Sequence, residues 1–129
     1  MLSACGPSAD ATERAAIAAK IDVIRRIPAA DTEARLRASE ELRRTPTSTF
    51  EGATARNACS AAFTALADGM RLIAQARAGL DPASTTDAEQ TLRAAASANA
   101  LLDQTEGLLD RCADALDWVG LSVDSGSER

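Results

Sequence analysis

Five carboxylates recur along the last long segment of this 129-residue chain at steps of three and four residues. They are Asp103, Glu106, Asp110, Asp114 and Asp117. On an α-helix this spacing places all five along one face, a candidate acidic binding face for a divalent cation, a cationic ligand or a basic partner. The alternatives are a solvated face and a face partly neutralised by arginines of the first two helices. Those arginines are Arg25, Arg26, Arg35, Arg37, Arg43 and Arg44.

The sequence offers little to catalysis. It contains no histidine, so both the commonest general base and a histidine metal ligand are missing. A hydrolase built on paired carboxylates would need two acids in one cleft with separated pKa values, and no pair in the sequence is marked out in this way. We therefore expect a protein that is not an enzyme and has no catalytic residue, no metal site and no cofactor.

Two of the three cysteines, Cys59 and Cys112, lie on or near the apolar seams of two long predicted helices. Folding these helices into a hairpin at about residue 83 brings the two cysteines within about one helical turn of each other, at a rise of ~1.5 Å per residue. The pattern predicts one of two arrangements. A disulfide would stabilise the fold by about 2–4 kcal/mol, whereas two buried free thiols would act as small hydrophobic side chains.

The third cysteine closes the segment Leu2-Ser3-Ala4-Cys5, which resembles the bacterial lipobox. In that motif an apolar residue and two small residues precede the cysteine that is lipidated after the signal peptide is cleaved. The following Gly6-Pro7-Ser8-Ala9 is similar to the tether between such a lipid and a folded domain. The resemblance implies lipidation of Cys5, a signal peptide that extends upstream of Met1 and an oxidising envelope in which a Cys59–Cys112 disulfide persists.

The composition favours helices in a single domain. Alanine supplies most of a hydrophobic fraction of 46%, while aromatic residues make up only 2%. Alanine loses no side-chain entropy in a helix, whereas strands prefer bulky side chains. A net charge of −5 argues against a nucleic-acid partner.

Four segments carry helical patterns. The first runs from the capping-box sequence Asp10-Ala11-Thr12-Glu13 to Ile27, and the second from Asp31 through Arg44. The third runs from about Phe50 to Ala78 and the fourth from a second capping box, Thr86-Asp87-Ala88-Glu89, to Gly120. The third carries a regular apolar seam, typical of a helix packed lengthwise against another. Its residues are Cys59, Phe63, Leu66, Met70, Ile73 and Leu80.

Helices joined by short loops pack as antiparallel neighbours, so we predict an all-α, up-down antiparallel bundle. The third and fourth helices form a long hairpin, and the first two cover its open face. The alternative is a three-helix bundle in which the second segment is a connector. We expect the lipobox remnant and tether at 1–9, the bundle domain at 10–121 and a disordered tail at 122–129.

These features favour a non-enzymatic, lipid-anchored interaction or structural module of the bacterial cell envelope, facing the periplasm or the surface. Its expected partners are the membrane, through the lipid on Cys5, and an envelope protein that contacts Trp118 and Leu121. One alternative is a bundle that binds a small ligand in its interior. Another is a cytosolic acidic adaptor or immunity-like protein, which follows if the lipobox match is accidental.

Overall fold

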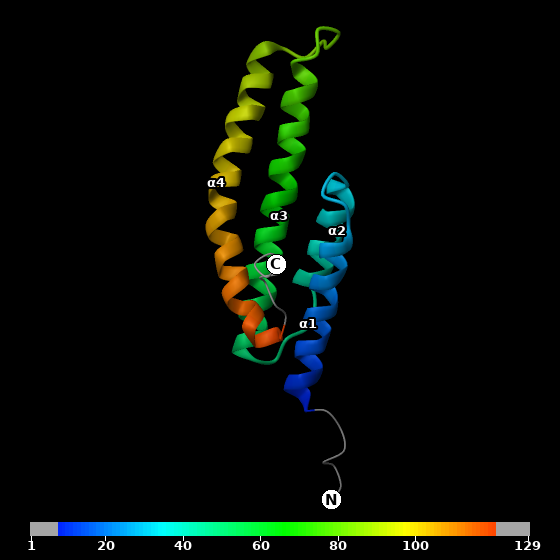
Figure 1. Cartoon of the computed structure of the whole chain (residues 1–129), viewed down its shortest axis with the longest axis vertical. Coiled ribbons are helices and arrows are strands. Elements are labelled where there is room, and N and C mark those ends of the chain that lie inside the picture. Colours follow the sequence, from blue (N-terminus) through cyan, green and yellow to red (C-terminus); the bar gives the residue numbers. More distant parts are fainter. Residues whose placement is uncertain (1–7, 121–129) are drawn as a thin grey trace, which may run out of the picture.

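The computed structural model describes residues 8–120, which form four helices and no strand. They are α1 (Ala9–Arg26), α2 (Thr32–Arg43), α3 (Phe50–Gly79) and α4 (Ala88–Val119). The two long helices form an antiparallel hairpin, and α1 and α2 pack beside it (Figure 1). The predicted all-α bundle with its hairpin is confirmed, and α2 is a helix rather than a connector. Of the predicted lipobox remnant and tether at 1–9, Ser8 and Ala9 belong to the start of α1, and residues 1–7 lie outside the described residues, as do Leu121 and the tail at 122–129.

The first helix begins one residue before the predicted capping box. The hydroxyl of Ser8 accepts a hydrogen bond from the Ala11 backbone N–H at 3.0 Å, so Ser8 is the N-cap. Asp10 lies inside the helix and pairs with Arg14 one turn later. The predicted box at Asp10 and Glu13 is therefore wrong, because a serine with extended backbone caps the helix first and Glu13 is bound elsewhere.

The last helix begins at Ala88, and its N-cap is Asp87 rather than the predicted Thr86. The Asp87 carboxylate accepts a hydrogen bond from the Glu89 backbone N–H at 3.1 Å, so the second predicted capping box is also shifted by one residue. Gly120 ends the helix as predicted, with a φ of 80° that side-chain-bearing residues rarely adopt.

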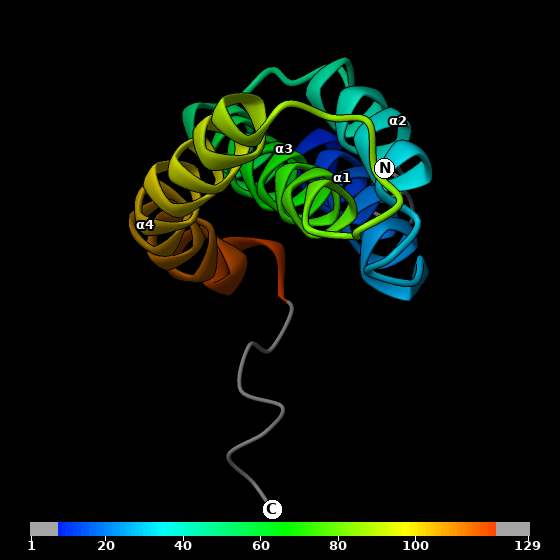
Figure 2. The ribbon, with the colours of Figure 1, turned by 90° about the horizontal axis from the view of Figure 1, so that it is seen from above.

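The apolar core lies in the lower half of the molecule as drawn in Figure 1, where α1 and α2 cover the hairpin. Seen from above, α3 lies between α4 and the pair formed by α1 and α2 (Figure 2). Ile17, Ile21 and Ile24 of α1 and Leu42 of α2 are fully buried there. They pack into one cluster with Cys59 and Leu116, so the first two helices contribute most of the large core side chains.

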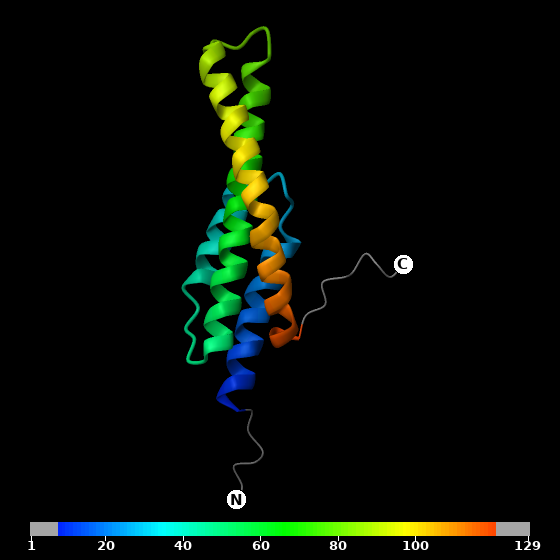
Figure 3. The same cartoon turned by 90° about the vertical axis from the view of Figure 1, so that its left-hand side faces the viewer.

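The upper halves of α3 and α4 extend beyond α1 and α2 as a two-helix arm, which we define as residues 66–102 (Figure 3). Its buried positions on the hairpin are small residues, among them Ala67, Gly69, Ala94 and Ala98. A Cβ atom at Gly69 would come within 2.7 Å of the Leu102 side chain, so glycine allows the two helices to approach closely here.

The predicted apolar seam of the third helix is therefore not the line along which the arm's helices meet. In the half of the hairpin that α1 and α2 cover, Cys59 is fully buried as expected. In the arm, Leu66, Met70 and Ile73 are only partly buried, and Leu80 is 75% exposed. Small residues lie along the line of contact because they let the two backbones approach closely, and the larger side chains of the predicted seam lie beside that line.

Candidate functional site

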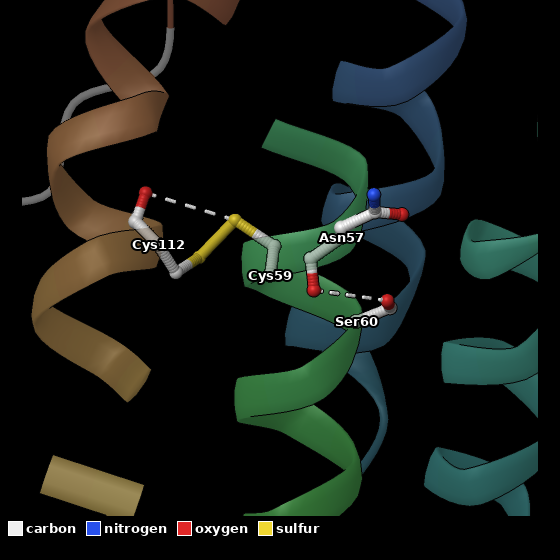
Figure 4. Close-up of a disulfide and its surroundings, with 4 residues drawn as sticks. All are labelled: Asn57, Cys59, Ser60 and Cys112. Carbon is white, nitrogen blue, oxygen red and sulfur yellow. Dashed lines mark hydrogen bonds between the residues drawn. A yellow bond between two sulfur atoms is a disulfide. The ribbon is translucent and has the colours of Figure 1, made fainter. Parts of the chain in front are cut away.

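A disulfide between Cys59 and Cys112 joins α3 to α4, as the sequence allowed (Figure 4). Both residues are buried, and their Cα atoms lie 4.5 Å apart. The link also fixes the register of the two antiparallel helices. Moving up the hairpin from the disulfide, each step forward from Cys59 on α3 is level with one step back from Cys112 on α4. The contact between Gly69 and Leu102, each ten positions away from its cysteine, agrees with this register.

A second buried polar feature is the Glu13 carboxylate, which lies at the N-terminus of α3 and is 8% exposed. Its Oε1 accepts hydrogen bonds from the Ser48 backbone N–H and hydroxyl, at 2.6 and 2.9 Å. Its Oε2 accepts one from the Thr49 hydroxyl at 2.7 Å and a longer one from the Thr49 backbone N–H. These hydrogen bonds, that of the Thr49 hydroxyl foremost, lower the pKa of Glu13 to about 2.

Gly52 has no side chain and so leaves room for this carboxylate. A Cβ atom at position 52 would clash with Glu13 Oε2. Thr49, the N-cap of α3, also accepts a hydrogen bond from the Gly52 backbone N–H at 2.9 Å. Negative charge at a helix N-terminus is stabilised by the unpaired N–H groups of the first turn. Glu13 is thus a structural contact between α1 and the start of α3.

The five carboxylates of the candidate acidic face all lie on α4, and all are exposed. No described lysine or arginine forms an ion pair with them, so the alternative of partial neutralisation by the first two helices is not found. Within residues 8–120, no three Asp, Glu or Cys side chains are placed to hold a metal ion. The structure therefore places these residues on a solvated face.

Trp118, the other candidate contact residue, is partly buried against the core. The Arg14 guanidinium lies over its ring, 5.3 Å from the ring centroid. The large apolar side chains that the described part of the chain exposes lie elsewhere. They are Val23, Phe50, Leu80, Leu92 and Leu109.

An open groove of about 550 Å³ runs between α2, α3 and α4. Its lining mixes apolar side chains, such as Leu101 and Leu108, with polar ones, such as Thr64 and Gln104. Ser60 also lines it, and its hydroxyl donates to the Asn57 backbone carbonyl at 3.3 Å (Figure 4). Every buried side-chain nitrogen or oxygen among the described residues has a hydrogen-bond partner. The groove thus exposes polar groups to solvent, but it contains no buried polar side chain that lacks a hydrogen-bond partner.

Two apolar grooves lie on another side of the hairpin and are the feature that the sequence analysis missed. The upper one, of about 280 Å³, is lined by Ile73, Arg77, Leu80 and Leu102 among others. The lower one, of about 310 Å³, lies beside the disulfide and includes Phe63 and Leu109 in its lining. The regular seam of the third helix was the available signal, but it was assigned to the hairpin's internal contact.

The residues of this surface share one side of each helix at steps of three and four, and we call them the arm face. It extends below the arm itself, to Phe63, Glu106 and Leu109. On α3 the arm-face residues are Phe63, Leu66, Met70, Ile73, Arg77 and Leu80. On α4 they are Leu92, Ala95, Asn99, Leu102, Glu106 and Leu109. Nine of these twelve residues are apolar.

Comparison of the chain with protein-family models, curated proteins and solved structures finds no significant match. None of the four described helices combines the length and apolar character needed to cross a membrane.

Proposed function

We propose that this protein is a non-enzymatic interaction module of the bacterial cell envelope, anchored to a membrane by a lipid on Cys5. The observation that carries the proposal is the use of the cysteines. Cys59 and Cys112 are joined in the core, which leaves Cys5, in its lipobox-like segment, as the remaining cysteine. Protein disulfides persist in oxidising compartments such as the bacterial envelope, where lipidated cysteines are also found.

An interaction role is supported by the kind of surface that the fold exposes. The grooves are open, and the arm face carries several large apolar side chains, with Leu80 75% and Leu92 69% exposed. Exposed apolar patches of this kind mark contact sites for other macromolecules. Seven of the eight ion pairs among the described residues join side chains three or four positions apart, as Arg93 and Glu89 do, and the eighth joins Lys20 to Glu41.

The test is the intact mass of the protein expressed in a bacterial host from the gene with its natural upstream sequence. The expected result is acyl mass on Cys5 together with a Cys59–Cys112 link that a reductant breaks, seen as a gain of about two mass units. The matched control is Cys5→Ser, which should lose the acyl mass and move from the membrane fraction to the soluble fraction while keeping the disulfide.

An unmodified Met1 with three free thiols would overturn the proposal. It would favour a cytosolic helical adaptor, for which the same exposed surface would still serve as a contact site. A lipidated Cys5 with two reduced core cysteines would retain the anchor and contradict the disulfide part of the argument.

A further inference from the structure

We propose that the arm face is the contact surface of a homodimer, in which the arms of two copies pair antiparallel as a four-helix bundle. The inference deepens the proposed interaction function by naming the partner as a second copy of this chain. It rests on the arm's geometry alone, so it stands or fails independently of the lipid on Cys5.

The arm face is the upward continuation of a surface that the fold covers in its lower half. Arg25 of α1 reaches the lower groove at Phe63, and beyond the end of α1 no described element covers this side of the arm. Two helices alone have no enclosed interior, so their apolar side chains stay wet until other helices cover them. Two more helices on this face would complete a four-helix bundle.

The spacing of the arm face on the two helices points to a second copy as the cover. Each arm-face residue of α3 has an arm-face counterpart on α4 exactly 29 positions later in the sequence. The pairs are Phe63 with Leu92, Leu66 with Ala95, Met70 with Asn99, Ile73 with Leu102, Arg77 with Glu106, and Leu80 with Leu109. Within one chain α3 and α4 run in opposite directions, so residues 29 positions apart cannot all lie at the same height along the arm. They can do so between one copy and a second copy that is turned end over end.

The disulfide register gives the position of the twofold axis. When two arms are inverted about an axis level with Arg71 and Ala100, each α3 residue lies in the same layer as its α4 counterpart in the other copy. Both helices rise ~1.5 Å per residue, so this matching of layers holds along the whole arm face.

The two charges on the arm face select this pairing. Arg77 interrupts the apolar run of α3 near the arm's tip, and Glu106 interrupts that of α4 nearer the disulfide. In the antiparallel dimer, Arg77 of one copy shares a layer with Glu106 of the other, and this happens twice. A parallel dimer would instead place arginine level with arginine and glutamate level with glutamate. Charged residues at such positions specify register and orientation in helical assemblies.

The same pairing accounts for the exposed leucines at the arm's tip. Leu80 and Leu92 of one copy come level with Leu109 and Phe63 of the other. Those two residues line the lower groove of about 310 Å³. The most exposed apolar side chains of the arm thus meet a hollow on the partner that is formed partly by the buried disulfide region.

The experiment is sedimentation equilibrium of the full oxidised chain with Cys5→Ser, which carries no lipid and no free thiol. We expect a mass twice the 13.4 kDa of one chain. Arg77→Glu and Glu106→Arg should each weaken association about a hundredfold or more, because each change affects two symmetric pairs worth about tenfold apiece. The double variant Arg77→Glu/Glu106→Arg should restore the dimer. Arg93→Glu, on the opposite side of the arm, is the matched control and should leave association unchanged.

Restoration by the double variant distinguishes a specific self-contact from a general effect of charge or folding, and circular dichroism checks that each variant stays helical. A chain that stays monomeric at high concentration would overturn the proposal. So would a dimer that the single variants leave intact, or one that they disrupt and the double variant does not restore. The mass of the lipidated protein is a separate measurement, so failure of one proposal is not mistaken for failure of the other.

Discussion

The two halves of the hairpin are built from the same two helices but are buried in different ways. In the lower half, α1 supplies three fully buried isoleucines, and Cys59 and Cys112 are linked within the cluster. In the arm, small residues line the contact between α3 and α4, and Leu80 and Leu92 face solvent. The contrast teaches that a hairpin with a close, small-residue contact holds its register but leaves its large side chains for another surface to bury.

The largest expected effect separates the two halves directly. Ile21→Ala removes a side chain that is 0% exposed and should destabilise the protein by about 2–5 kcal/mol, because a cavity forms in a packed core. Ile73→Ala, the same change on the partly buried arm face, should cost less than about 1 kcal/mol in the monomer. Urea denaturation at low protein concentration measures both. Equal losses would contradict the division into a packed half and an uncovered arm.

Reduction of the disulfide is expected to have the next largest effect. The link joins residues 53 positions apart, and its loss should cost about 2–4 kcal/mol as the unfolded chain regains freedom. The measurement compares urea midpoints with and without reductant. The control is the Cys59→Ser/Cys112→Ser variant, whose midpoint should not respond to reductant. An unchanged midpoint in the parent chain would show that the link does not stabilise the packed half.

Acid should act on the packed half through Glu13. Its pKa is lowered to about 2 in the folded state by hydrogen bonds from Thr49 and Ser48. A carboxyl with a lowered pKa stabilises the fold fully above its unfolded value of about 4.3, and this contribution is lost as pH falls toward 2. The urea midpoint should therefore drop between pH 5 and about 2. Glu13→Gln should have a lower midpoint at pH 7 and a shallower drop, while the exposed Glu41→Gln should retain the parent's pH profile.

The smallest effect is expected on the acidic face of α4. Asp114 is exposed and forms no ion pair with a described residue, so Asp114→Asn should change the free energy of unfolding by less than about 0.5 kcal/mol. Calcium should not raise the melting temperature of the parent chain. A calcium-dependent rise that Asp114→Asn removes would turn this solvated face into a binding site.

The sequence was sufficient for the four helices, because these follow from local patterns, but its spacing left open whether Cys59 and Cys112 form a disulfide or stay as free thiols. Helical periodicity set the four elements, and a hairpin turn near residue 83 was enough to bring Cys59 and Cys112 together. The capping boxes were off by one or two residues because several neighbouring side chains compete for the same backbone N–H groups. In the structure, Ser8 caps α1 and Asp87 caps α4.

The arm face and the Glu13 contact were out of reach of the sequence for a different reason. Periodicity identifies the apolar side of a helix but not what covers it, so Leu66 and Ile73 looked like residues of the hairpin's own interface. Glu13 contacts residues 35 and 36 positions away, and only the packing of α1 against the start of α3 brings them together. Gly52 leaves the space that this carboxylate occupies, and the sequence carries no sign of that role.

The most direct test of this account is hydrogen exchange of the oxidised full chain, followed by mass spectrometry at low and at high protein concentration. Helical amides of the arm should exchange faster than those around Ile21 and Cys59 at low protein concentration, and should become protected as the concentration rises. The packed half should not change. Arm amides that are as protected as the packed half at every concentration would contradict the claim that the arm needs a partner.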